Sequence, residues 1–223
     1  MILLLAAEGV EAEALLGELG RRRRVRGPFR AFVGHFAGRE AAVVETLVGK
    51  AAAAAATAWA FDRFAPRAAF FAGVAGALDP DLKTGDLLVA RDAVQWDVDL
   101  TPFGRAPGEL ATGERFVPAD SALTRLLAGV AGGRIGRVAS GDRFVNDAEL
   151  AAWIRATFAA DVVEMEGAAA LWAARRLGVP MALLRVVSDA ATAGSEGDFA
   201  AFLAEGSARM ARVLKAAVAA LEP

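Results

Sequence analysis

Short apolar runs alternate along the chain with stretches in which apolar residues recur at helical spacing. Residues 1–7, 68–72 and 181–187 are almost wholly apolar and of strand length, which is typical of strands buried on both faces of a sheet. This alternation continues through all 223 residues without a linker or a repeat. The pattern therefore predicts a single three-layer α/β domain over residues 1–223.

The boundaries of the other elements follow from apolar spacing and from turn and stop residues. Helices are predicted at 10–19, 51–64, 119–130, 148–158, 168–177 and about 199–221, and further strands at 30–36 and 40–48 (a hairpin), 85–94, 134–140 and 161–163. The Arg21–Arg24 run is interpreted as a solvated loop, and residues 96–116 as a long irregular connection. Asn146 with Glu149 resembles a capping box that starts the helix at 148.

Polar side chains interrupt the apolar pattern in the second half of the chain. Glu164 and Glu166 lie where a strand meets a helix, Arg185 lies inside an apolar strand, and Ser188 and Asp189 end that strand. A buried charge is costly unless it is paired, and ligands of open α/β sheets bind beyond the carboxyl ends of strands. We therefore expect a site here, although either acid read alone is equally consistent with a helix cap.

Composition narrows the available chemistry. There is no cysteine and one histidine, His35, so disulfides, thiolate nucleophiles and Cys- or His-based metal sites are excluded, and we expect no metal and no cofactor. The net charge of −2 gives no reason to expect nucleic acid as a partner. No apolar run reaches the roughly 18–20 residues of a membrane span, and residues 1–7 lack the basic flank of a signal peptide. We expect a cytoplasmic protein that does not bind membranes.

The remaining motifs point to carboxylates. There is no G-x-S-x-G elbow and no G-x-G-x-x-G after a strand, and Gly49-Lys50 is not a phosphate-binding P-loop because Val44 and Ala51 occupy two of its required positions. Glu11, Glu166 and Asp189 stand at three separate strand ends. An acid and a base that flank an anomeric carbon cleave glycosidic bonds. The residue pattern alone thus indicates a carboxylate-dependent hydrolase.

Three motifs together carry a family resemblance. The segments V-E-M-E-G-A-A (163–169), L-R-V-V-S-D (184–189) and S-G-D-R-F-V-N (140–146) resemble the nucleoside phosphorylase and nucleosidase superfamily, most closely the 5′-methylthioadenosine/S-adenosylhomocysteine nucleosidases. The resemblance extends in order over nearly the whole chain. It implies a three-layer α/β/α sandwich with a central mixed sheet, hydrolysis of the N-glycosidic bond of a 5′-substituted adenine nucleoside, and a homodimer in which the 96–116 segment of one copy closes the pocket of the other.

The resemblance also implies roles for individual residues. Asp189 is the expected general acid, which protonates the purine as the sugar becomes oxocarbenium-like. Glu11 is expected to deprotonate the attacking water, and Arg185 to help to position that water. Glu166 is expected to hold the ribose hydroxyls, with Met165 packed against the sugar.

The rest of the expected binding set surrounds the purine and the 5′ substituent. Phe144 is expected to stack on the purine, and the backbone of Val145 to read its edge. The apolar 5′ pocket is expected to contain Val48, Phe103 and Phe199. The other expected substrate-binding residues are Ser188, Glu164 and Val74.

Departures from the family pattern leave the 5′ group open. Phosphorolytic relatives bind phosphate with an Arg and a Ser or Thr, where this chain has Phe71 and Val74, so water is the expected nucleophile. Val74 and Gly167 resemble futalosine hydrolase, whereas Asp189 suits a 6-aminopurine. Glu8 replaces a methionine usual in the alkylthio pocket. The leading hypothesis is release of adenine from 5′-methylthioadenosine or S-adenosylhomocysteine; the alternative is a futalosine or aminofutalosine hydrolase of menaquinone biosynthesis.

Overall fold

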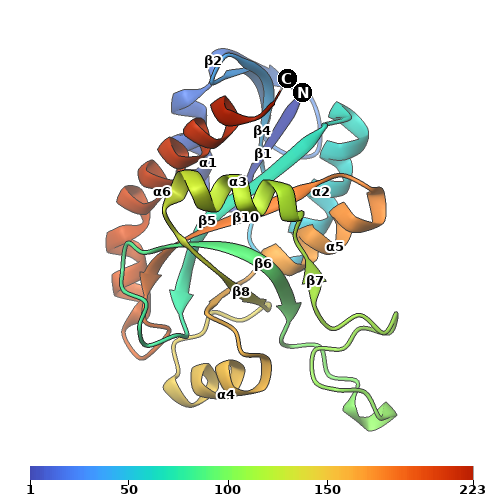
Figure 1. Ribbon diagram of the computed structural model, residues 1–223, viewed down its shortest axis with the longest axis vertical. Coiled ribbons are helices and arrows are strands. Elements are labelled where there is room, and N and C mark those ends of the chain that lie inside the picture. The colour runs from blue at the N-terminus through green and yellow to red at the C-terminus, as the bar shows by residue number, and fades with distance from the viewer. Residues whose placement is uncertain (223) are drawn as a thin grey trace.

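The centre of the molecule is a mixed sheet of ten strands with helices on both faces (Figure 1). This computed structural model describes residues 1–222. The strands are β1 (Ile2–Ala6), β2 (Gly20–Val25), β3 (Ala31–Phe36), β4 (Arg39–Glu45), β5 (Ala68–Ala77), β6 (Leu87–Gln95), β7 (Val117–Pro118), β8 (Arg134–Ser140), β9 (Val162–Glu164) and β10 (Met181–Asp189). The helices are α1 (Gly9–Glu18), α2 (Lys50–Phe64), α3 (Ser121–Ala131), α4 (Ala148–Phe158), α5 (Gly167–Leu177) and α6 (Ser195–Ala220), with a 3₁₀ turn η1 (Thr101–Phe103).

Alternation of side chains along the buried strands divides the core into two layers. In β1, Leu3 and Leu5 belong to one apolar cluster and Ile2 and Leu4 to another, because successive side chains point to opposite faces of a sheet. The first cluster takes in α2 and α5, and the second takes in α1, α3 and α6. The three-layer architecture predicted from the apolar pattern is thus confirmed.

Part of the sheet closes on itself. Strands β2, β3, β4, β1 and β5 form an open array, of which β1, β4 and β5 run parallel. Beyond β5 the order β5–β10–β6–β8–β9 returns to β5, since β10 pairs with both β5 and β6 and β9 pairs with both β8 and β5. The parallel strands β1, β5 and β10 therefore deliver their carboxyl ends to one edge, where the loops that follow them converge.

The Arg21–Arg24 run forms strand β2 instead of a loop. It pairs with β3 on one side only, and its side chains are exposed. An edge strand with solvent on both faces does not need alternating apolar residues, and charged side chains protect such an edge from aggregation. For this reason the hydrophobic pattern did not reveal it.

The cap of α4 lies one residue later than the sequence motif suggested. The N-cap is Asp147, whose Oδ1 accepts hydrogen bonds from the backbone N–H groups of Glu149 (2.8 Å) and Leu150 (3.0 Å). Asn146 precedes the cap and is exposed. The predicted capping box with Asn146 was therefore wrong, although the helix itself was predicted correctly.

Replacing Asp147 by Ala should lower the midpoint of thermal unfolding by a few degrees, because two N–H groups at the start of α4 lose their acceptor. Asn146→Ala serves as the matched control and should leave the midpoint unchanged. Circular dichroism melts of both variants test this. Equal effects of the two substitutions would contradict the assignment of Asp147 as the cap.

Candidate active site

A cavity of about 250 Å³ lies at the edge of the sheet where β1, β5, β9 and β10 end. It is lined by Ala7, Glu8, Glu11, Val48, Val74, Ala75, Gly76, Arg143, Phe144, Val145, Val163, Glu164, Met165, Glu166, Ser188, Asp189 and Phe199. All the residues expected from the sequence to form the site are among these, except Arg185 and Phe103. Polar side chains from four separate segments of the chain therefore converge on one cavity.

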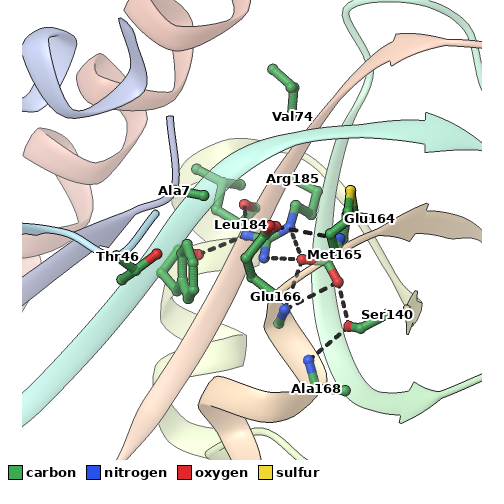
Figure 2. Close-up of polar contacts among 12 residues, drawn as sticks. Ala7, Thr46, Val74, Ser140, Glu164, Met165, Glu166, Ala168, Leu184 and Arg185 are labelled. Atoms are coloured by element: carbon green, nitrogen blue, oxygen red, sulfur yellow. Dashed lines mark hydrogen bonds and ion pairs between the residues drawn. The ribbon is translucent and has the colours of Figure 1, made fainter. Parts of the chain in front are cut away.

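Arg185 lies behind the cavity wall as the partner of Glu164 (Figure 2). Its side chain is 1% exposed, and its Nη2 and Nε donate to Glu164 Oε2 at 2.5 and 3.2 Å. Its Nη1 donates to the carbonyl oxygens of Phe71 (3.1 Å) and Leu184 (2.9 Å). The guanidinium is thus occupied by protein groups, and Arg185 is not among the residues that line the cavity.

Glu164 joins three elements through its carboxylate. Besides Arg185 on β10, it accepts hydrogen bonds from the backbone N–H of Gly167 (3.0 and 2.8 Å) and from the hydroxyl of Ser140 on β8. Ser140 in turn accepts from the N–H of Ala168 at 2.8 Å. The first turn of α5 is therefore linked to the end of β8 through Ser140 and to the middle of β10 through Arg185, as Figure 2 shows.

This crowding explains glycine at position 167. A Cβ there would lie 2.8 Å from Leu183 Cδ1 and 3.0 Å from Arg185 Nη2. Contacts shorter than 3.0 Å require the neighbouring atoms to move. Gly167 thus leaves room for the Arg185–Glu164 pair in this chain.

Glu11 presents a buried carboxylate held by backbone donors. It lies in the first turn of α1 and accepts from the N–H groups of Ala7 (3.1 Å), Glu8 (2.9 Å) and Val74 (2.9 Å). Burial raises its pKa and outweighs the lowering effect of these hydrogen bonds. Gly73 is needed beside it, since a Cβ there would lie 2.9 Å from Glu11 Oε1. A fixed carboxylate with a raised pKa is suited to accept a proton.

Glu166 occupies the N-cap position of α5. Its Oε1 accepts from the N–H of Gly49 at 2.8 Å, where the backbone has φ of 100°, a value that favours glycine. Burial, with a smaller contribution from the negative charge of Glu164, raises the pKa of Glu166 to about 8. Glu166 therefore supplies a polar group that carries a proton near neutral pH and lies beside the cavity.

Asp189 ends β10 at an irregularity in its pairing with β5. Its Oδ1 accepts from the N–H of Ala191 at 2.8 Å, and the hydroxyl of Ser188 donates to Oδ2 at 2.7 Å. A Cβ on Gly76 would lie 3.0 Å from Oδ1, which is a tight contact, so the glycine leaves this carboxylate room. The orientation of Asp189 is thus set by its immediate neighbours.

An apolar wall completes the cavity. The rings of Phe144 and Phe199 meet edge to face with centroids 5.9 Å apart, and Val48, Val74 and Met165 lie around the same cavity. Phe144 and Val48 are 38% and 45% exposed, whereas Glu11, Glu166 and Asp189 are buried. The acids therefore form the floor of the cavity and the apolar side chains reach its mouth.

Phe103 does not reach the cavity of its own chain. It ends the η1 turn and is 82% exposed, on a loop that projects away from the sheet (Figure 1). The loop is held by its own contacts, among them Gly108 N–H to the Val98 carbonyl (2.9 Å) and Arg105 to Glu109 (2.6 Å). Phe103 thus lies outside the cavity formed by its own chain.

Sequence reasoning missed the lining residues Ala7, Ala75, Gly76, Arg143 and Val163. Four of them are small or apolar and carry no sequence signal of a site. Arg143 stands directly before Phe144 in the S-G-D-R-F-V-N motif, so its position could have drawn attention to it. Across residues 1–222, no group of three or more acidic or histidine side chains is placed to hold a metal ion, and no helix is long and apolar enough to cross a membrane.

The raised pKa of Glu166 predicts a pH dependence of folding stability. The folded protein holds a proton on Glu166 that the unfolded chain releases near 4.5, so this contribution is present below pH 4.5 and is lost as the pH rises through about 8. In urea titrations, the free energy of unfolding of Glu166→Gln should therefore fall less between pH 5 and 8 than that of the wild type. The free energy of unfolding of Glu166→Gln should still fall somewhat as the pH rises, because the pKa of Glu11 is raised as well.

The control for this experiment is Glu40→Gln, which removes an exposed carboxylate and should keep the wild-type slope. An unchanged slope in Glu166→Gln would show that Glu166 is already ionised in the folded protein at pH 5.

Comparison with known proteins identifies relatives of this chain. A curated aminodeoxyfutalosine nucleosidase of Campylobacter jejuni is 38% identical over 70% of this chain and 70% of its own length. A 5′-methylthioadenosine/S-adenosylhomocysteine nucleosidase of Tolumonas auensis is 33% identical over 76% of this chain and 77% of its own length. The crystal structure of a mutant Helicobacter pylori nucleosidase with 5′-methylthioadenosine in its active site superposes with a TM-score of 0.96 at 31% identity, covering 99% of this chain and 98% of that chain. The profile of the phosphorylase superfamily matches residues 2–219, and the chain belongs to that family.

Proposed function

We propose that this protein hydrolyses the N-glycosidic bond of 5′-substituted adenine nucleosides such as 5′-methylthioadenosine or S-adenosylhomocysteine, and releases adenine. The observation that carries the proposal is the convergence of Glu11, Glu166 and Asp189 on one cavity with an aromatic wall. Each carboxylate accepts a hydrogen bond from a backbone N–H group: Glu11 from Val74, Glu166 from Gly49 and Asp189 from Ala191. Such fixed acids beside an apolar wall suit a planar base joined to a hydroxylated sugar.

The proposed reaction needs one acid and one base. Asp189 transfers a proton to the imidazole-ring nitrogen of the purine as the bond from that base to C1′ breaks, and the bonding electrons leave with the base. The sugar becomes oxocarbenium-like, and water adds to C1′ while Glu11 takes the proton of that water. Glu166 holds the ribose hydroxyls, and Phe144 stacks on the purine. The Arg185–Glu164 pair keeps β9, β10 and α5 in register around these groups.

The lining of the cavity suits water as the nucleophile better than it suits phosphate. Five carboxyl groups line it, and the arginine nearest the floor, Arg185, is occupied by Glu164 and two carbonyl groups. Phe71 and Val74 supply no donor side chain beside Glu11. A phosphate dianion would lack charge-assisted partners there. These features support hydrolysis over phosphorolysis.

A second candidate substrate is aminodeoxyfutalosine, of menaquinone biosynthesis. The named activity of the Campylobacter jejuni relative favours it, as do Val74 and Gly167. The two candidates share the adenine and the ribose and differ only in the 5′ substituent. The chemistry at Asp189 and Glu11 is therefore the same for both.

We further propose that the protein acts in the cytoplasm, without a cofactor, as a homodimer. Val48 and Phe144 leave the mouth of the cavity open, and the loop 96–116 carries Phe103 into solvent. A second copy whose loop covers this mouth would bury both apolar surfaces. This would place Phe103 in the pocket of the partner.

The first test is release of adenine from 5′-methylthioadenosine, S-adenosylhomocysteine and aminodeoxyfutalosine, each with and without inorganic phosphate. We expect equal rates in the two buffers with at least one substrate, because water is the nucleophile. A strict requirement for phosphate would overturn the hydrolase assignment. Inactivity of the purified wild type toward every nucleoside would overturn the enzyme assignment.

Asp189→Asn should lower kcat by a hundredfold or more, the typical contribution of a positioned general acid. The amide preserves the size of the side chain and can still accept from Ala191 N–H, so folding should be retained. Ser195→Ala, a buried polar change outside the cavity, is the control and should keep kcat near that of the wild type. Near-normal turnover of Asp189→Asn would remove Asp189 from the acid role.

Glu11→Gln should abolish turnover while leaving substrate binding close to the wild-type value, since its role is in the water step. The amide oxygen can still accept a backbone N–H bond, but the side chain no longer takes up a proton. Stopped-flow turnover and calorimetric titration with 5′-methylthioadenosine separate the two effects. Retained turnover would exclude Glu11 as the base.

A further inference from the structure

The segment that joins β4 to α2 contacts Glu166 through a backbone that is not favourable by itself. Leu47 and Gly49 both have positive φ angles, 65° and 100°, and a positive φ costs free energy for a residue with a side chain such as Leu47. The N–H of Gly49 donates to Glu166 Oε1 at 2.8 Å. Because glycine adopts many conformations, the torsions of Gly49 do not by themselves orient that N–H. Contacts from outside the segment therefore have to hold it in place.

Three hydrogen bonds form a closed ring beside this segment. The N–H of Lys50 donates to Asp142 Oδ1 at 2.7 Å, and the N–H of Asp142 donates to Asp97 Oδ2 at 2.9 Å. The ammonium group of Lys50 donates to Asp97 Oδ1 at 2.5 Å and completes the ring. Each of the three residues thus contacts the other two, and the ring joins the start of α2, the loop 96–116 and the segment that carries Phe144.

The ring also accounts for the Gly49-Lys50 pair, which is not a phosphate-binding loop. A Cβ on Gly49 would lie 3.1 Å from Asp142 Oδ1, so a side chain at this position would press on the ring. The side chains of Lys50 and Asp97 are 15% and 24% exposed, and a partly shielded ion pair within a network contributes more than an isolated surface pair. Of residues 1–222, those that line the cavity include none of the three ring residues. The ring therefore lies outside the cavity, next to the N–H group that donates to Glu166.

We propose that Asp142 and Asp97 are positioning residues for the ribose. Through the ring they hold the N–H of Gly49 against the carboxyl group of Glu166, which is proposed to bind the ribose hydroxyls. The inference rests on the proposed function and adds to it two residues that do not touch the substrate. Loss of either carboxylate should weaken binding of the sugar, because Glu166 is then less firmly placed, and should leave the proton transfers intact.

The test compares KM and kcat of the wild type and Asp142→Ala with each of the three nucleosides that the wild type hydrolyses. We expect KM to rise about tenfold, in line with the loss of one hydrogen bond to a charged group, and kcat to change by less than about twofold. Asp142→Asn keeps Oδ1 as an acceptor for the N–H of Lys50 and should restore KM to near the wild-type value. Free adenine carries no ribose, so its inhibition constant should be the same in Asp142→Ala and the wild type.

Asp120→Ala is the matched control. Asp120 lies outside the cavity, and its Oδ1 accepts from the N–H groups of Ala122 (3.0 Å) and Leu123 (2.9 Å) at the start of α3. Its loss removes the same kind of contact from another helix and should lower the midpoint of thermal unfolding without raising KM. A rise in KM confined to Asp142→Ala therefore does not come from lower stability.

Asp97→Ala removes the acceptor of both the Lys50 ammonium group and the Asp142 N–H, so it should raise KM in the same way. An unchanged KM in Asp142→Ala or in Asp97→Ala would overturn the proposal while leaving the hydrolase assignment intact. Weaker inhibition by adenine in Asp142→Ala would also overturn it, because the purine subsite would then be distorted.

Inactivity of the wild type toward all three nucleosides would instead overturn the proposed function. Calorimetric titration with 5′-methylthioadenosine then decides the positioning role: weaker binding to Asp142→Ala than to Asp120→Ala supports it, and equal or undetectable binding overturns it.

Discussion

The site depends on the buried ion pair between Arg185 and Glu164. Removing two charges from water is costly, and the cost is offset only where both groups find all their hydrogen-bonding partners. Here the guanidinium reaches the backbone of β5 and β10, and the carboxylate reaches β8 and the first turn of α5. Loss of one partner of such a pair typically costs about 3–5 kcal/mol, because the other charge stays buried. The pair thus fixes the relative positions of the strand ends that carry the functional acids.

The carboxyl groups near this ion pair lie in different electrostatic environments. Glu164 faces a cation, whereas Glu166, two residues away, has its pKa raised to about 8 by burial and, to a smaller extent, by the negative charge of Glu164. Glu11 is held by three backbone N–H groups, and burial still raises its pKa. Similar side chains on one cavity therefore differ: Glu164 anchors the fold, Glu166 carries a proton near neutral pH, and the role of a base is proposed for Glu11. Their environment, more than their residue type, sets these roles.

The features that could be predicted from the sequence are those that depend on local patterns of apolar and polar residues. Buried strands such as β1 and β10 stand out as apolar runs, and the carboxylates of the site appear where those runs end. The edge strand β2 was missed because both of its faces are exposed, and Asp147 was missed because Asn146 offered a similar cap one residue earlier. The burial of Arg185 behind the wall and the distance of Phe103 from the cavity depend on tertiary packing. The periodicity of apolar residues does not predict how distant segments pack, so it could not predict these two positions.

The closed part of the sheet also bears on how the protein folds. Strand β10 lies between β5 and β6, although about a hundred residues separate it from them in the chain. Until residues 181–189 are in place, β5 and β6 have unpaired edges and Arg185 is absent from the position in which it binds Glu164. Contacts of such high sequence separation form slowly, because loop closure costs entropy before the pairing compensates for it. On the ribosome, the catalytic floor is therefore assembled only after the last strand has emerged, and shorter nascent chains expose strand edges that chaperones can recognise.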